Sequence, residues 1–131
     1  MEYRYRNDRS TRSNIEVFDR VLNKLGRIKT VRAVVYRNKY RVETETILVR
    51  GENGYARFGG LNWGYSGEGP RGTQQLLKKL GVNQEIANFL CFNETTFELG
   101  EVWKITFNNN IATVEHHRST TCKVLHTKLA S

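Results

Sequence analysis

Residues 28–58, IKTVRAVVYRNKYRVETETILVRGENGYARF, decide the fold. Two runs rich in β-branched and aromatic residues flank the tight turn Arg37-Asn38-Lys39, and a Gly-Glu-Asn-Gly turn precedes a third run. Such runs, bounded by turn residues, are typical of strands joined by hairpins. The sequence therefore predicts three consecutive strands, at about 28–36, 40–49 and 55–59.

A helix is predicted directly before this region, over residues 14–25. Ser13 and Glu16 have the spacing of a capping box, and Gly26 is a typical helix stop. The apolar residues between them recur at helical spacing, at Ile15, Phe18, Val21, Leu22 and Leu25. Residues 1–12 are polar and arginine-rich, and we expect either a flexible arm or an edge strand there.

Two short helices and three strands are predicted after residue 69. PRGTQQLLKKLG places Pro70 in the first turn of one helix, and Asn83 caps the second, NQEIANFLCFN. EVWKITF and IATVEHH form a hairpin across Asn108-Asn109-Asn110, and TTCKVLHTKL alternates as a last strand. The expected fold is one α+β domain over residues 1–131, with a mainly antiparallel sheet of five to six strands, an N-terminal helix and two short central helices.

The formal net charge is +8, and the excess of cations belongs to the first half of the chain. Residues 1–57 carry 14 basic and 7 acidic side chains, and 11 of the 14 cations are arginine. Guanidinium groups bind phosphate through paired hydrogen bonds and stack on flat rings. This composition favours a phosphorylated partner, and a basic surface without a partner is the alternative.

The sequence gives no sign of a membrane or secreted protein. No apolar run approaches the length of a membrane span, and MEYRYRNDRSTRS lacks the apolar region of a secretory signal. Cys91 and Cys122 do not have the spacing of a metal motif, so buried thiols in a reducing cytosol are favoured over a disulfide. We expect a cytoplasmic protein without a cofactor or a membrane partner.

The stretch WGYSGEGPRG, residues 63–72, is the first candidate site. Glycines let the backbone approach a ligand closely, and a helix N-terminus presents free N–H groups to an anion. The predicted phosphate contacts are Ser66, Gly67, Gly69, Arg71, Gly72 and Thr73, with Trp63 and Tyr65 stacking a base and Arg57 and Arg118 adding charge. The alternative is a structural turn in which Trp63 and Tyr65 pack against the sheet. The site interpretation predicts non-enzymatic binding of a phosphorylated small ligand, most simply a nucleotide.

Residues 58–80 resemble small uncharacterised bacterial and phage domains in which a W-G-Y-x-G-x-G-P run leads into a helix. The resemblance implies a gene context associated with phage or mobile elements. Small phage proteins that sequester the cyclic nucleotide signals of host immunity are an analogous class, and the analogy implies an anti-defence role by sequestration. We expect a homo-oligomer, in which basic residues of a neighbouring copy complete the site.

The arginine-rich segment EYRYRNDRSTR, residues 2–12, is the second candidate surface. On a strand, Arg4 and Arg6 face one side while Tyr3 and Tyr5 face the other. That arrangement suits single-stranded nucleic acid, and it suits an edge strand that packs its tyrosines on a core equally well. The alternative function is therefore a nucleic-acid-binding module, for a single strand or for DNA, with contacts from Arg4, Arg6, Arg9 and Arg12.

The histidines of EHHR, residues 115–118, are the third candidate. Neighbours on a strand point to opposite faces, so His116 and His117 do not easily share a metal ion. His126 could face one of them across a hairpin. A metal site or a small nuclease needs further ligands that the sequence pattern does not reveal, so we expect neither a metal nor an enzyme.

Overall fold

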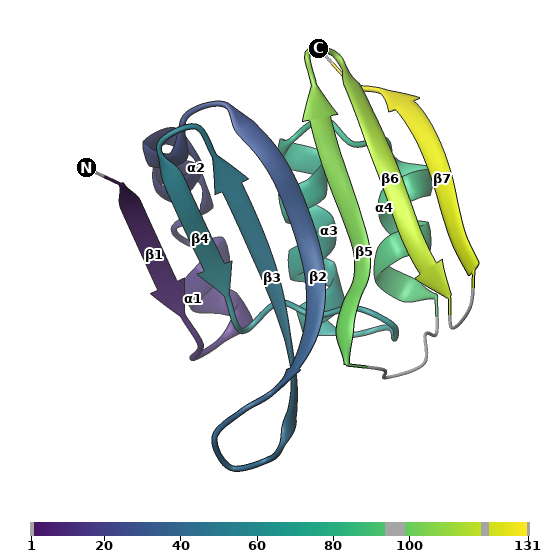
Figure 1. Ribbon diagram of the computed structural model, residues 1–131. Coiled ribbons are helices and arrows are strands. Elements are labelled where there is room, and N and C mark those ends of the chain that lie inside the picture. Colours follow the sequence, from purple (N-terminus) through teal and green to yellow (C-terminus); the bar gives the residue numbers. More distant parts are fainter. Residues whose placement is uncertain (1, 94–98, 119–120, 131) are drawn as a thin grey trace.

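The computed structural model describes the backbone of residues 2–93, 99–118 and 121–130, and their side chains except those of 118 and 121–123. Within these ranges, seven strands form one sheet in the order β1-β4-β3-β2-β5-β6-β7 (Figure 1). β1 pairs with β4 in parallel, and the other neighbouring strands are antiparallel. The strands are β1 (Tyr3–Asn7), β2 (Ile28–Arg37), β3 (Glu43–Gly51), β4 (Gly54–Phe58), β5 (Gly100–Asn108), β6 (Ile111–Arg118) and β7 (Thr121–Lys128).

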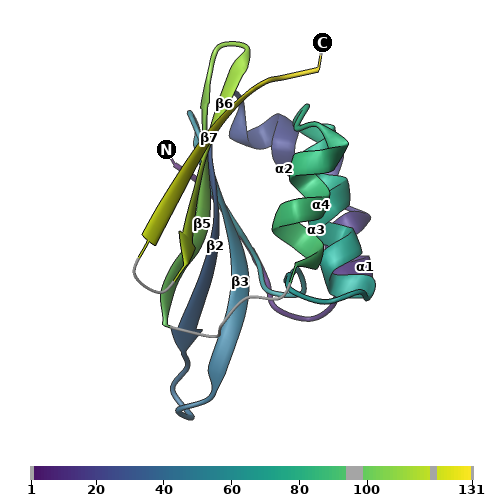
Figure 2. The same ribbon diagram turned by 90° about the vertical axis from the view of Figure 1, so that its right-hand side faces the viewer.

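Four helices in the described ranges cover one face of this sheet (Figure 2). They are α1 (Thr11–Ile15), α2 (Phe18–Leu25), α3 (Glu68–Lys79) and α4 (Gln84–Phe92). The core lies between the two layers, where Phe18 and Leu76 of the helices and Val31 and Trp103 of the sheet are fully buried. No described helix covers the opposite face, which is turned toward the viewer in Figure 1. We call it the open face.

The coarse α+β prediction with a mainly antiparallel sheet is confirmed, and the strand count of five to six is wrong by at least one. β1 is the additional strand, and of the two predictions for residues 1–12 the edge strand is correct. Tyr3 and Tyr5 pack against the core and Arg4 and Arg6 point outward, as the alternation predicts.

The N-terminal helix differs from the predicted helix over 14–25, because it begins earlier and is interrupted. Ser10, not Ser13, is the N-cap, and its side chain accepts a hydrogen bond from the Ser13 backbone N–H. Asn14 is buried between the two layers, where its Oδ1 accepts a hydrogen bond from the Tyr5 hydroxyl at 3.0 Å. The helix is interrupted after α1, and Val17 serves as the N-cap of α2.

The two central helices are where the sequence predicts them. α3 begins at Glu68, so Pro70 lies in its first turn, and the Asn83 side chain caps α4 by accepting from the Ile86 N–H at 2.9 Å. The three strands after α4 and the turn between β5 and β6 are also confirmed. The β2–β3 hairpin is correct in kind, but its loop is longer than the predicted Arg37-Asn38-Lys39 turn, because β2 continues to Arg37 and β3 begins at Glu43 instead of at residue 40.

Candidate functional site

The glycine-rich stretch leads from β4 into α3 on the helix side of the sheet. Trp63 is only 1% exposed and packs edge-to-face against Trp103, with 6.3 Å between the ring centroids. The predicted stacking role of Trp63 is therefore wrong, because a buried indole offers no face to a base. Tyr65 is 46% exposed, and its hydroxyl accepts a hydrogen bond from the Asn62 side-chain amide.

Close packing accounts for several of the other residues in this stretch. A Cβ at Gly72 would lie 2.6 Å from Thr11 Cγ2, and a Cβ at Gly69 would overlap the Asn62 side chain. The buried Thr73 hydroxyl donates to the Asn62 carbonyl oxygen at 2.6 Å, so its proton is not available to a phosphate. The close-packed turn thus explains Gly69, Gly72 and Thr73 without a ligand.

The surface of the turn retains Ser66, Gly67 and Arg71. The first turn of α3 also contains Glu68. Its carboxylate complements the positive end of the helix dipole and repels an incoming anion. These residues therefore make a weaker anion site than the sequence indicates.

The structure does not bring the predicted cationic residues together. Arg57 lies on β4 and points to the open face, whereas Arg71 lies on α3 in the opposite layer. The side chain of Arg118 lies outside the described residues. Among the alternative contacts, Arg4 and Arg6 lie on the open face of β1, Arg9 follows that strand, and Arg12 is exposed on α1.

The register of the sheet aligns four cations on the open face, which we call the cationic row: Arg6, Arg57, Arg32 and Lys104. Arg6 pairs with Arg57 across β1 and β4, and Arg32 pairs with Lys104 across β2 and β5. Leu48 of β3 lies between Arg57 and Arg32. Because neighbouring strands are about 4.8 Å apart, the row spans about 19 Å.

Like charges directly opposite each other on neighbouring strands destabilise a sheet. Carboxylates offset part of this repulsion. Arg6 Nε lies 2.8 Å from Asp8, which raises the Arg6 pKa through a hydrogen bond and its charge, and Arg32 Nε lies 2.7 Å from Glu101. Lys104 makes no ion pair with a described residue. The row therefore retains cationic groups that a bound anion would neutralise.

Two hollows lie along the cationic row, and Arg57 lines both of them. The first, of about 550 Å³, has Leu48 and Tyr55 beside the cations Arg32, Arg50, Arg57 and Lys104. The second, of about 680 Å³, extends past Arg6 and Tyr36 to the β2–β3 hairpin, where Tyr40 is 74% exposed. Together the hollows form a track over the open face.

Aromatic rings hold the arginines of this track in place. The Arg57 guanidinium lies over the Tyr36 ring, 4.3 Å from its centroid, and Arg4 and Arg50 both approach the Tyr55 ring. Arg57 Nε and Nη2 are buried and donate no hydrogen bond to a described residue. Within the described ranges its ion-pair partner is Asp8, whose Oδ1 lies 3.9 Å from Arg57 Nε. Arg57 is thus oriented by stacking on Tyr36.

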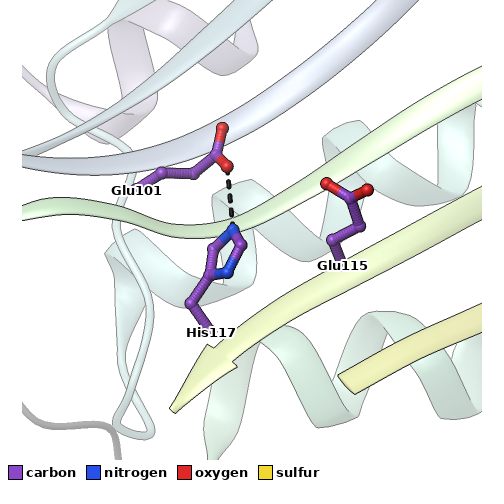
Figure 3. Close-up of side chains that lie close together, drawn as sticks. All are labelled: Glu101, Glu115 and His117. Atoms are coloured by element: carbon purple, nitrogen blue, oxygen red, sulfur yellow. Dashed lines mark hydrogen bonds and ion pairs between the residues drawn. The ribbon is translucent and has the colours of Figure 1, made fainter. Parts of the chain in front are cut away.

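A group of titratable side chains adjoins the row on β5 and β6. Glu101 accepts hydrogen bonds from Arg32 through Oε1 and from His117 Nε2 through Oε2, the latter at 2.9 Å, and Glu115 lies beside them (Figure 3). Burial raises the Glu101 pKa, but the hydrogen bonds and charges of Arg32 and His117 outweigh it, so the net shift is downward. Glu101 is therefore ionised at neutral pH.

The three histidines lie in different places. His116 is buried on the helix side, against Phe89, whereas His117 faces the open side, so the prediction of opposite faces is confirmed. His126 hydrogen-bonds to Thr113 and joins neither of them.

Several residues of this surface are absent from the sequence-based candidates, notably Arg32, Arg50, Tyr55, Lys104, Glu101 and Glu115. Arg50 and Arg57 occupy outward positions of two strands joined by a tight turn, so alternation alone could have placed both on the same face. Lys104 and Glu101 join the surface through the pairing of β2 with β5, which contains a bulge after Ala33. Local sequence does not encode that pairing.

The described helices include none that is long and apolar enough to cross a membrane. No protein-family model, no curated protein and no solved structure matches the chain.

Proposed function

We propose that this protein binds single-stranded nucleic acid across the open face of its sheet. The observation that carries the proposal is the cationic row, which aligns two adjacent pairs of cations across five strands, with Leu48 of β3 between the pairs. Single-strand binding surfaces combine a positively charged groove with aromatic rings on which bases stack. Tyr36, Tyr40 and Tyr55 supply such rings beside the row.

The shape of the surface favours a polymer over a compact ligand. The two hollows share Arg57 and continue along the sheet, so an extended chain of phosphates can contact both. Arg57 is already oriented by Tyr36, which reduces the entropy lost when it binds phosphate. No described helix covers this face, so unpaired bases can reach the exposed rings of Tyr40 and Tyr55.

The test is fluorescence anisotropy with a labelled single-stranded oligonucleotide and a duplex of the same length. The variants are Arg57→Gln and Lys104→Gln, and the control is Arg71→Gln, an equal charge change on the helix layer. We expect each of the first two to weaken binding by about 1.5–3 kcal/mol, as for hydrogen bonds to charged groups. The control leaves affinity unchanged.

Two results would contradict the proposal. One is the absence of saturable binding to any single strand at low salt. The other is a loss of affinity in Arg71→Gln that equals the loss in Arg57→Gln, because the contact would then lie at the glycine-rich turn.

A phosphorylated small ligand, such as a linear or cyclic nucleotide, is the second candidate. The first hollow supports it, since 550 Å³ is within the usual range of small-molecule sites and four cations surround an apolar floor. Sequestration of such a signal would follow from tight binding without chemistry. A thermal-shift screen tests it: a salt-tolerant rise in melting temperature with one nucleotide, lost in Arg57→Gln, would favour this ligand over a polymer.

A further inference from the structure

Glu101, Glu115 and His117 lie together on the open face, beyond the end of the cationic row. They come from neighbouring strands β5 and β6, and one ligand atom of each lies within 4.8 Å of the others (Figure 3). All three side chains are partly buried. The adjacent strands therefore hold one imidazole and two carboxylates in a small volume.

The distances between these groups suit a bound metal ion. His117 Nε2 and Glu101 Oε2 are 2.9 Å apart. In a tetrahedral zinc site, ligand atoms about 2.1 Å from the metal are about 3.4 Å from one another. If His117 and Glu101 moved slightly apart, the ion could take the place of the proton in their hydrogen bond. That proton would leave Nε2, and a neutral imidazole would carry its proton on Nδ1 instead. Glu115 can bring its carboxylate closer by rotating about its side-chain torsions.

Arg32 acts on this group from outside. Its Nε hydrogen bond fixes Glu101 Oε1 and leaves Oε2 directed at His117. Carboxylates that bind metals are commonly held by such an outer partner. The group offers one imidazole and two carboxylates, which are too few oxygen ligands for the hard cation Ca²⁺ and leave Mg²⁺ to be held mostly by water.

We propose that Glu101, Glu115 and His117 form a three-ligand site for Zn²⁺, with an open coordination position toward the open face. Mixed nitrogen and oxygen donors suit this ion, and zinc sites with three protein ligands keep a position for water or another ligand. The site goes beyond the proposed nucleic-acid binding and does not depend on it.

The test is a Zn²⁺ titration of the metal-free 131-residue chain by calorimetry, in a buffer without phosphate and without nucleic acid. Cys122 pairs with His117 in the β6–β7 register, so all proteins carry Cys122→Ser to exclude a thiol ligand. We expect one ion per chain. His117→Ala and Glu115→Gln should each weaken binding by at least about tenfold, because each removes a ligand.

Matched controls are His126→Ala, a histidine of β7 on the same face, and Glu43→Gln, a carboxylate of β3. Both should retain wild-type affinity. Glu115→Gln preserves the shape of the side chain, so it remains informative if His117→Ala does not fold, as judged by circular dichroism. The absence of a saturable site, or unchanged affinity in Glu115→Gln, would overturn the proposal. Arg57→Gln should bind Zn²⁺ normally, which separates this result from the nucleic-acid test.

Discussion

Gly72 lies where α3 packs against α1 and against Leu61. In a Gly72→Ala chain the new Cβ would be 2.6 Å from Thr11 Cγ2 and 2.8 Å from Leu61 Cδ2. Overpacking costs about 1–3 kcal/mol, while alanine gains about 1 kcal/mol in helix propensity over glycine. We therefore expect a net loss in the free energy of unfolding, of about 1 kcal/mol, in urea titrations. The exposed neighbour Arg71→Ala is the control, and equal stability of the two variants would show that α1 can move away.

Glu45 is a residue at which the fold places a carboxyl group unfavourably. Burial raises its pKa above 4.5, although a hydrogen bond with the Trp63 backbone opposes the shift, and its Oε2 is buried without a partner in the described ranges. The native state therefore holds this proton more tightly than the unfolded state does. Stability from Glu45 is present below pH 4.5 and is lost as pH rises through the native pKa.

Glu45→Gln removes this dependence on pH. Relative to wild type, the variant should gain stability at pH 7 and lose that advantage as the pH falls through the native pKa of Glu45 toward 4.5. Thermal unfolding across this range measures the difference. A constant difference at all pH values would show that the carboxyl group titrates alike in both states.

At the scale of elements, the β2–β3 hairpin extends beyond the helix layer (Figure 2). Asn38 orders its tip, because its Oδ1 accepts from the Tyr40 and Val42 backbone N–H groups at 2.9 and 3.1 Å. We expect Asn38→Ala to speed hydrogen exchange at these two amides while the melting temperature changes little, since the tip is remote from the core. If Tyr40 helps to stack bases, oligonucleotide affinity falls too. Unchanged exchange rates would show that the backbone hydrogen bonds between β2 and β3 are enough to order the tip.

The elements that sequence predicts well are those with local signals. The turn at Asn108–Asn110 and the Asn83 cap are encoded by adjacent residues, and the structure contains both. The start of α1 was missed because Ser10 and Ser13 are both good caps, and Tyr5 with Asn14 decides between them through a tertiary contact. For β1 the sequence left an edge strand and a flexible arm as equal alternatives, because its partner strand, β4, is distant in the chain.

The candidate site was less predictable than the fold. Glycines near Trp63 are expected both where a ligand approaches the backbone and where the chain packs closely. Only the burial of the indole distinguishes these two explanations. Arg57 was foreseen as a cationic contact, but its neighbours Arg32 and Lys104 meet it through strand register across four strands. Patterns of single segments carry no information about that alignment.

At the scale of the whole molecule, the net charge of +8 should make the affinity for nucleic acid depend on salt concentration. If the row neutralises about three to four phosphates of a single strand, log K against log[salt] should have a slope of about −2 to −3. Arg57→Gln should reduce that slope by about 0.7. Anisotropy titrations at several salt concentrations measure it. A nearly flat plot would instead favour the nucleotide in the first hollow.

The parallel pairing of β1 with β4 imposes an order of events on a chain made from its N-terminus. Tyr3 pairs with Gly54, so β1 leaves the ribosome before β4 and has no partner in the sheet until β4 has been synthesised. The hairpins of β2, β3 and β4 need only local loops, which close faster than distant contacts. We expect the amides of β1 to gain protection after those of β2, β3 and β4 when refolding is followed by pulsed hydrogen exchange. Simultaneous protection of β1 and β3 would show instead that the sheet forms in one step.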